Sequence, residues 1–295
     1  GENVGLVGIA RLDASGDAGG GSVLVGGNYQ GGGPEHNATR AFVGSGVTIN
    51  ADALSRGDGG RVITWADDWT RFYGTVSARG GAAGGDGGFV EVSGKQNLAF
   101  AGSVVTSAPR GRTGTLLLDP GDLYVGANPG GGIPAATDTD STAGVLFEAD
   151  GGTFIRRDFY VLASSLSSDS KYVLRAQDNV IFNADVAFGT TGGDAAKFVS
   201  VEAGEAIRSE PGVTSISTAG GALSLNAGTT IDIGAAINTN GGVLTINSAG
   251  AAALSGGVTG VGSSLVKQGA GELSLSGSNT YSGGTIIRVG TLRTA

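Results

Sequence analysis

Short runs in which apolar and polar residues alternate recur along most of the chain, separated by turns rich in glycine, asparagine and aspartate. Alternation of this kind predicts β-strands with one buried face, as in residues 222–226, 243–247 and 273–275. No stretch of a dozen residues shows the 3.6-residue period and the capping residues that predict an amphipathic helix. The pattern therefore predicts an all-β protein.

The strand-like runs belong to an internal repeat. The tetrapeptide Gly-Asp-Gly-Gly occurs at 57–60 and again at 85–88, a step of 28, and an apolar run follows each copy. Similar runs recur at steps of 12 to 15, at Val47, Val62, Val76, Val90, Val104 and Leu116. In the C-terminal third, residues 220–226 recur as residues 241–247, a step of 21. Periods of this length are typical of stacked repeats.

Units of roughly 21 to 28 residues with glycine-rich corners predict a right-handed parallel β-helix, in which each coil places a strand above its counterpart. Propellers are disfavoured because their blades repeat at about 40 residues or more. We expect regular coils in residues 1–120 and 199–295. Residues 121–198 are less regular and predict an extra-helical loop or insertion, with an excursion in the middle of the chain.

Composition narrows the classes of function. The 295 residues carry a formal net charge of −8, one histidine and no cysteine. An acidic chain argues against non-specific nucleic-acid binding, and a single histidine provides little acid–base chemistry near neutral pH. The absence of cysteine excludes disulfides and thiolate metal sites. No apolar run reaches the roughly 18–20 residues that cross a bilayer. We therefore expect a protein that is not an enzyme, with no catalytic residue, cofactor or metal site.

Two segments resemble families of exported bacterial proteins. Residues 21–120 resemble the large exoproteins of the filamentous-haemagglutinin type, which are exported by two-partner secretion. The matching motifs are residues 25–31, 45–53, 57–65, 70–81, 85–95 and 114–120. Residues 265–285, with 289–292, are similar to the passenger-associated repeat of autotransporters.

The resemblance implies a secreted protein that passes through an outer-membrane two-partner transporter and is displayed at the cell surface. It implies a non-enzymatic shaft segment of an adhesin, acting in attachment, biofilm or fibre formation, with a host-cell or matrix glycan or protein as receptor. The alternatives are a stalk for contact-dependent toxin delivery and a carbohydrate-active β-helix enzyme. Because the chain stops within the apolar run 284–292, unpaired strand edges also predict end-to-end self-association into filaments. No nucleic-acid partner is expected.

Arg56, Gly57 and Asp58 form the tripeptide that integrins bind, and haemagglutinin-type adhesins carry such sequences. The repeat favours another interpretation. Gly57 and Asp58 begin a corner element that occurs twice, and Arg56 precedes only one of the two copies.

A second candidate ligand-binding surface is the densest aromatic cluster of the chain. Its members are Trp65, Asp67, Asp68, Trp69, Arg71, Phe72 and Tyr73. Aromatic faces beside carboxylates and an arginine commonly bind sugars; alternatively, some rings fill the core and Arg71 pairs with an aspartate. Two carboxylates could hydrolyse a glycoside if they lay about 5–10 Å apart across the bond. Neighbours on a strand point to opposite faces, so Asp67 and Asp68 could do so only from a turn.

The remaining polar residues predict no site. His36 lies in a glycine-rich loop and is expected to be solvated. Residues 137–141 lack the glycine and the terminal glutamate of a calcium loop and predict a polar turn. Lys267 and Arg288 are expected to be exposed strand residues.

Overall fold

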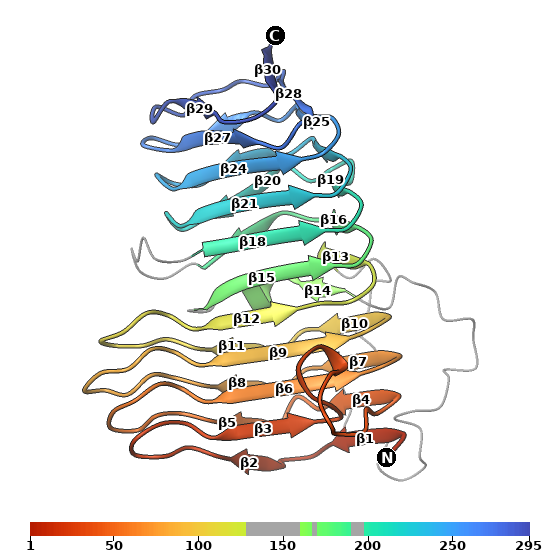
Figure 1. Cartoon of the computed structure of the whole chain (residues 1–295), viewed down its shortest axis with the longest axis vertical. Helices are drawn as coiled ribbons and strands as arrows, with labels where there is room; N and C mark the ends of the chain where they lie inside the picture. The colour runs from red at the N-terminus through yellow and green to blue at the C-terminus, as the bar shows by residue number, and fades with distance from the viewer. Residues whose placement is uncertain (128–159, 167–169, 190–197) are drawn as a thin grey trace.

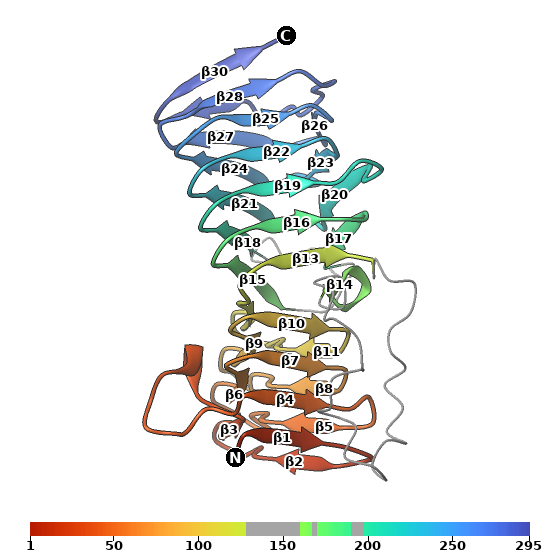
Figure 2. The same ribbon diagram turned by 90° about the vertical axis from the view of Figure 1, so that its right-hand side faces the viewer.

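The chain coils around one axis, and the computed structural model describes residues 1–127, 160–166, 170–189 and 198–295 of it. The strand pairs in these ranges are parallel, and strands far apart in sequence lie side by side. Strands of one face run from left to right in Figure 1 while the chain climbs from the N-terminus, and those of the next face run from left to right in Figure 2. The described chain is therefore a right-handed parallel β-helix, which confirms the predicted fold class.

Three faces enclose the core. One is a ten-stranded sheet of β3 (Ser22–Val25), β6 (Arg61–Ala66), β9 (Phe89–Gly94), β12 (Thr115–Leu118), β15 (Lys171–Ala176), β18 (Phe198–Ala203), β21 (Ala222–Ala227), β24 (Val243–Ser248), β27 (Ser264–Gln268) and β29 (Thr285–Ile287). The next is a twelve-stranded sheet of β1 (Asn3–Leu6), β4 (Arg40–Val43), β7 (Trp69–Phe72), β10 (Asn97–Phe100), β14 (Val161–Leu162), β13 (Leu123–Gly126), β16 (Val180–Phe182), β19 (Ile207–Ser209), β22 (Ile231–Ile233), β25 (Ala252–Leu254), β28 (Glu272–Leu275) and β30 (Thr291–Thr294).

The third face consists of two four-stranded sheets. The first contains β2 (Arg11–Asp13), β5 (Thr48–Asn50), β8 (Thr75–Ser77) and β11 (Ser103–Val105). The second contains β17 (Val186–Phe188), β20 (Ser215–Thr218), β23 (Ala236–Asn238) and β26 (Val258–Thr259). Two short 3₁₀ turns complete the described elements, η1 (Tyr29–Gly31) and η4 (Ala163–Leu166).

The repeat spacings correspond to the geometry of the coil. Val62 of β6 pairs with Val90 of β9, so the 28-residue step is one full coil. Val76 lies between them in sequence but belongs to β8 on the third face, which makes the 14-residue step half a coil. Val47 does not take part in this stack, because the residue that pairs with Val76 is Ile49.

The core is a set of columns in which like residues stack. Alternate residues of the ten-stranded sheet point inward, and rungs in register place them directly above one another. One column consists of Val62, Val90, Leu116, Tyr172, Val199, Leu223, Leu244 and Leu265, all buried. Burial of each such side chain stabilises the fold by about 1.5–3 kcal/mol relative to exposure. The alternation of apolar residues therefore explains why this face of the sheet packs inward.

The stacking order changes once, near the middle. In the twelve-stranded sheet β14 lies between β10 and β13, although β13 comes first in sequence. On the third face, the turn η4 borders both β11 and β17, where one four-stranded sheet ends and the other begins. The chain therefore returns to fill a rung beneath one that it has already formed. The expected divisions at residues 121 and 199 stay a prediction, since 128–159 and 190–197 lie outside the described residues, as do 137–141.

Candidate functional site

A strap covers part of the outer face of the ten-stranded sheet. We use this name for residues 26–38, which leave the sheet after β3 and fold back over β6 and β9 (Figure 2, red loop on the left). The Tyr29 ring packs edge-on against Phe89 with 5.7 Å between centroids, and the Arg61 guanidinium lies 5.5 Å from the Tyr29 centroid. Gly31 lies directly against Trp65, because a Cβ there would come within 2.7 Å of the indole.

Outward side chains near the strap are withdrawn from water. Ile63 and Glu91 are fully buried, and Trp65 is only 4% exposed. On β24, far from the strap, the outward residues Thr245 and Asn247 remain half-buried. The strap thus closes over the Trp65 indole and the Glu91 carboxyl group, which Gly31 and Gln30 contact directly.

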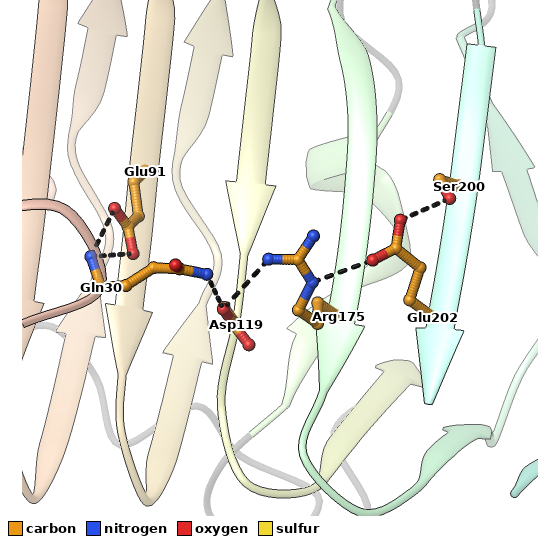
Figure 3. A network of polar contacts seen from close by, with 6 residues as sticks. All are labelled: Gln30, Glu91, Asp119, Arg175, Ser200 and Glu202. Carbon is orange, nitrogen blue, oxygen red and sulfur yellow. Dashed lines mark hydrogen bonds and ion pairs between the residues drawn. The ribbon is translucent and has the colours of Figure 1, made fainter. Parts of the chain in front are cut away.

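Glu91 is held by the backbone of the strap. The Gln30 amide N–H donates to both carboxylate oxygens, Oε1 and Oε2, at 3.2 Å each (Figure 3). Burial raises the pKa of Glu91 to about 7, and the nearby charge of Asp119 acts in the same direction. The Gln30 amide, the Ser93 hydroxyl and the Arg61 guanidinium oppose this rise. Glu91 is therefore a carboxyl group that changes charge near neutral pH.

The Gln30 side chain extends the network to the next rung. Its Nε2 donates to Asp119 Oδ2 at 2.9 Å, and Arg175 Nη1 lies 3.7 Å from the same oxygen. Arg175 Nε donates in turn to Glu202 Oε2 at 2.9 Å (Figure 3). Burial raises the pKa of Asp119, although the contacts with Gln30 and Arg175 partly offset that effect.

The network continues as a ladder along the sheet. Arg175, Glu202, Asn226 and Asn247 stand at equivalent positions on four successive rungs. With small residues such as Gly204 they line an open groove of about 550 Å³. The ladder satisfies much of its own hydrogen bonding, because Asn247 Nδ2 donates to Asn226 Oδ1 at 3.3 Å and Arg175 bonds Glu202.

The predicted aromatic surface is divided between two faces. Trp65 lies under the strap, whereas Trp69 lies on the outer face of the twelve-stranded sheet and is 2% exposed. The Arg71 guanidinium is 4.8 Å from the Trp69 centroid, and the Tyr73 ring packs at 5.9 Å from that of Phe42. The structure thus brings Trp69, Arg71 and Tyr73 together but separates them from Trp65.

Asp67 and Asp68 lie in the turn between β6 and β7, the one position from which adjacent carboxylates could act together. Asp67 Oδ1 accepts from Trp65 Nε1 at 3.0 Å and from Asn37 Nδ2 at 3.1 Å. Asp68 accepts from Arg40 Nε at 3.4 Å, rather than from Arg71. Both aspartates thus connect neighbouring segments of the coil.

Arg56, Gly57 and Asp58 form a corner between the third face and the ten-stranded sheet. Gly57 has a φ of +94° and its N–H donates to the Gly84 carbonyl at 2.8 Å. Asp58 Oδ1 accepts from the Asp86 N–H at 2.7 Å, so the two tetrapeptide copies stack on each other. The corner interpretation matches this geometry, while the Arg56 side chain is exposed. Receptor binding by this tripeptide stays a prediction.

Sequence reasoning did not select Gln30, Glu91 or Asp119. Gln30 and Glu91 are 61 residues apart, and no local motif connects a glycine-rich loop with an outward strand position. The alternation places Glu91 on the outer face, where a carboxyl group is ordinarily solvated. The one available signal is the apolar environment of Glu91, between Val90 and Val92.

Lys267 was expected to be exposed, and this prediction is wrong. Its side chain is fully buried in an inward column between Ile246 and Ile287. The Nζ donates to the carbonyls of Gln268 at 2.5 Å and Gly269 at 2.8 Å. Burial lowers the pKa of this amine. The ammonium group thus donates hydrogen bonds to the Gln268 and Gly269 carbonyls at this corner, which an aliphatic side chain could not do. Arg288 is exposed, as predicted, but it follows β29 and does not lie in a strand.

Lys267→Ala is expected to lower the free energy of unfolding by about 2–4 kcal/mol, because it leaves a cavity and unpaired carbonyls. Urea denaturation monitored by circular dichroism measures this. The control is Lys95→Ala at an exposed turn residue, which should change stability by less than about 0.5 kcal/mol. Equal effects of the two substitutions would contradict the buried position of Lys267.

The described ranges contain no cluster of three or more histidine or acidic residues suited to a metal ion. Within these same ranges, no helix has the length and apolar character required to span a bilayer.

Residues 265–293 match the family model of the passenger-associated transport repeat. These residues include β28, β29 and all but the first residue of β27, and with them Lys267 and its carbonyl partners. No curated protein matches the chain. The protein is therefore a parallel β-helix with a passenger-type repeat in its last coils, and this repeat marks a secreted or surface-exposed protein.

Proposed function

We propose that this chain is a shaft segment of a surface-displayed bacterial adhesin, which acts in attachment, biofilm or fibre formation and catalyses no reaction. The observation that supports the proposal is a parallel β-helix whose last coils match a passenger-associated transport repeat. Each coil of a solenoid contacts only its neighbours, so the fold extends along one axis and can hold a binding surface away from the cell.

Export through an outer-membrane two-partner transporter is part of this proposal. The chain has no cysteine, so no disulfide can form before passage through a pore and hinder threading. Short strands separated by glycine corners also allow coils to form one after another outside the cell. The proposed receptor is a glycan or protein of a host cell or its matrix.

Attachment of protein-coated beads tests the adhesive function. Beads carrying residues 1–295 are expected to bind cultured host cells or matrix material saturably, and the soluble protein should release no reducing ends from a polysaccharide panel. Beads that bind no better than albumin-coated beads would overturn the adhesive function. Release of reducing ends would instead favour the enzyme alternative.

The same assay tests the exposed corner arginine. Because Gly57 and Asp58 are engaged in coil stacking, we expect Arg56→Ala to leave attachment unchanged within about twofold. Arg110→Ala, at another exposed arginine, is the matched control. A loss specific to Arg56→Ala would instead assign residues 56–58 to receptor binding.

End-to-end self-association is also proposed, since unpaired strand edges can pair with another chain. Light scattering at increasing concentration should detect it. Dispersed monomers at high concentration would count against filament formation.

A further inference from the structure

The strap presents a peptide N–H to a carboxyl group that lies buried beneath it. Gln30 adopts a φ of +52°, a left-handed conformation that is uncommon for residues other than glycine. This conformation directs its N–H at both oxygens of Glu91 while its side chain reaches Asp119. Closure of the strap therefore also buries the Glu91 carboxyl group.

The Gln30 N–H and the Ser93 hydroxyl support a negative charge on the buried carboxyl group, but the effect of burial on its pKa outweighs them. The Gln30 N–H is shared between its two oxygens at 3.2 Å, which is long for a charge-assisted hydrogen bond. The charged groups on the elements packed around it are Arg61 on β6, Asp119 after β12, Arg175 on β15 and Glu35 on the strap. Arg61 Nη2 donates to Asn28 Oδ1, and Arg175 bonds Glu202, so both cations are engaged elsewhere.

The composition of the strap favours opening that leaves the strands of the coil in place. Glycine occupies positions 26, 27 and 31–33 of the strap, which leaves its backbone easily rearranged. Some of its contacts are local, such as Asn28 Nδ2 to Glu35 Oε2 at 2.8 Å, and Tyr29, Gln30 and Asn37 provide side-chain or backbone contacts with the sheet. Loops of this kind open at lower free energy than the strands beneath them.

We propose that the strap is a proton-sensitive lid, closed over Trp65 and Glu91 when the Glu91 carboxyl group is protonated and opened more often when that group is charged. Opening exposes the Trp65 indole and returns the carboxylate to water. The lid thus connects the pH outside the cell to exposure of an aromatic surface on the shaft.

The direction of the pH dependence of lid closure follows from the pKa of Glu91 in the closed and the open lid. In the closed lid the pKa of Glu91 is about 7, against an ordinary value of 4.5 in the open lid. The closed form therefore holds the proton more tightly, so closure is most favourable below pH 4.5 and weakens as pH rises to about 7. The closing equilibrium constant should fall about 70-fold between pH 5 and pH 8.

Hydrogen exchange of the peptide containing residues 26–38 tests this, measured on the whole chain at pH 5 and pH 8 and corrected for intrinsic exchange. In the wild-type protein, the protection of this peptide against exchange should fall by about 70-fold from pH 5 to pH 8. In Glu91→Gln, which mimics the protonated group, the protection should change by less than about threefold. His36→Gln is the control, because His36 is exposed on the strap and is the only histidine in the sequence. It should behave as wild type.

Any one of three results would overturn the proposal. The first is wild-type protection of the strap that stays constant between pH 5 and pH 8. The second is a loss of protection in Glu91→Gln as large as that of wild type, and the third is abolition of the loss by His36→Gln. Protection of the β24 peptide reports whether each variant is folded, and it should be independent of pH in all three proteins.

Discussion

Gly87→Ala is expected to lower the free energy of unfolding by about 3 kcal/mol or more, one of the two largest single-residue effects that we predict. A Cβ at this corner would lie 1.8 Å from the Thr106 carbonyl oxygen and 2.4 Å from the Gly114 nitrogen. Both atoms are backbone, and Gly114 belongs to the next coil. Relief of the clash therefore requires two coils to separate. The midpoint and slope of urea denaturation measure the loss.

Gly234→Ala is the matched control. The nearest atoms to a Cβ there are the Ser209 and Ser255 hydroxyl oxygens at 3.7 and 3.9 Å. The substitution should be neutral or stabilise the protein by up to about 1 kcal/mol, since alanine restricts the unfolded chain. If both variants lost the same stability, coils would not stack at the Gly87 corner as described.

Phe72→Ala is expected to cost about 3–5 kcal/mol. Phe72 is fully buried and stacks on Phe100 with 5.7 Å between ring centroids, one rung above. Its removal leaves a cavity and ends an aromatic contact worth roughly 0.5–1.5 kcal/mol. Because a solenoid is stabilised by contacts between neighbouring coils, exchange protection should fall most in β4, β7 and β10.

Phe198→Ala provides the comparison, because Phe198 is the first residue of β18 and is 41% exposed. We expect a loss below about 1 kcal/mol, measured by the same urea denaturation. A cost for Phe72→Ala no greater than that for Phe198→Ala would place Phe72 outside the core column.

The coil and its inward columns could be predicted from sequence because they depend on local periodicity. Val62 and Val90 occupy equivalent positions after identical Gly-Asp-Gly-Gly corners, so their stacking follows from spacing alone. The 14-residue step was also informative, although only the structure shows that it connects two different faces. The position of β14 beneath β13 could not be predicted, because nothing in a two-residue strand indicates which rung it joins.

The candidate site was less accessible to sequence reasoning. Trp65 and Trp69 are close in sequence and were expected to share one surface, yet a corner between β6 and β7 directs them to different faces. Alternation places Lys267 on the same inward face as Leu265, but its charge led to the expectation that it would be exposed. A buried ammonium group is tolerated there because corner carbonyls lie within its reach.

The sequence by itself determined the solenoid, the length of its regular coils and its glycine corners, since each depends on residues within one or two repeats, whereas the longer steps from Val23 to Val62 and from Leu116 to Tyr172 became clear only in the structure. The passenger-type character of the last coils was likewise evident from their residues. The tertiary structure alone decided that Glu91 is buried, that Gln30 closes over it, and that a ladder continues from Asp119 to Asn247. The physical reason is that a period of two specifies which side chains face outward, whereas a distant segment decides whether water reaches them.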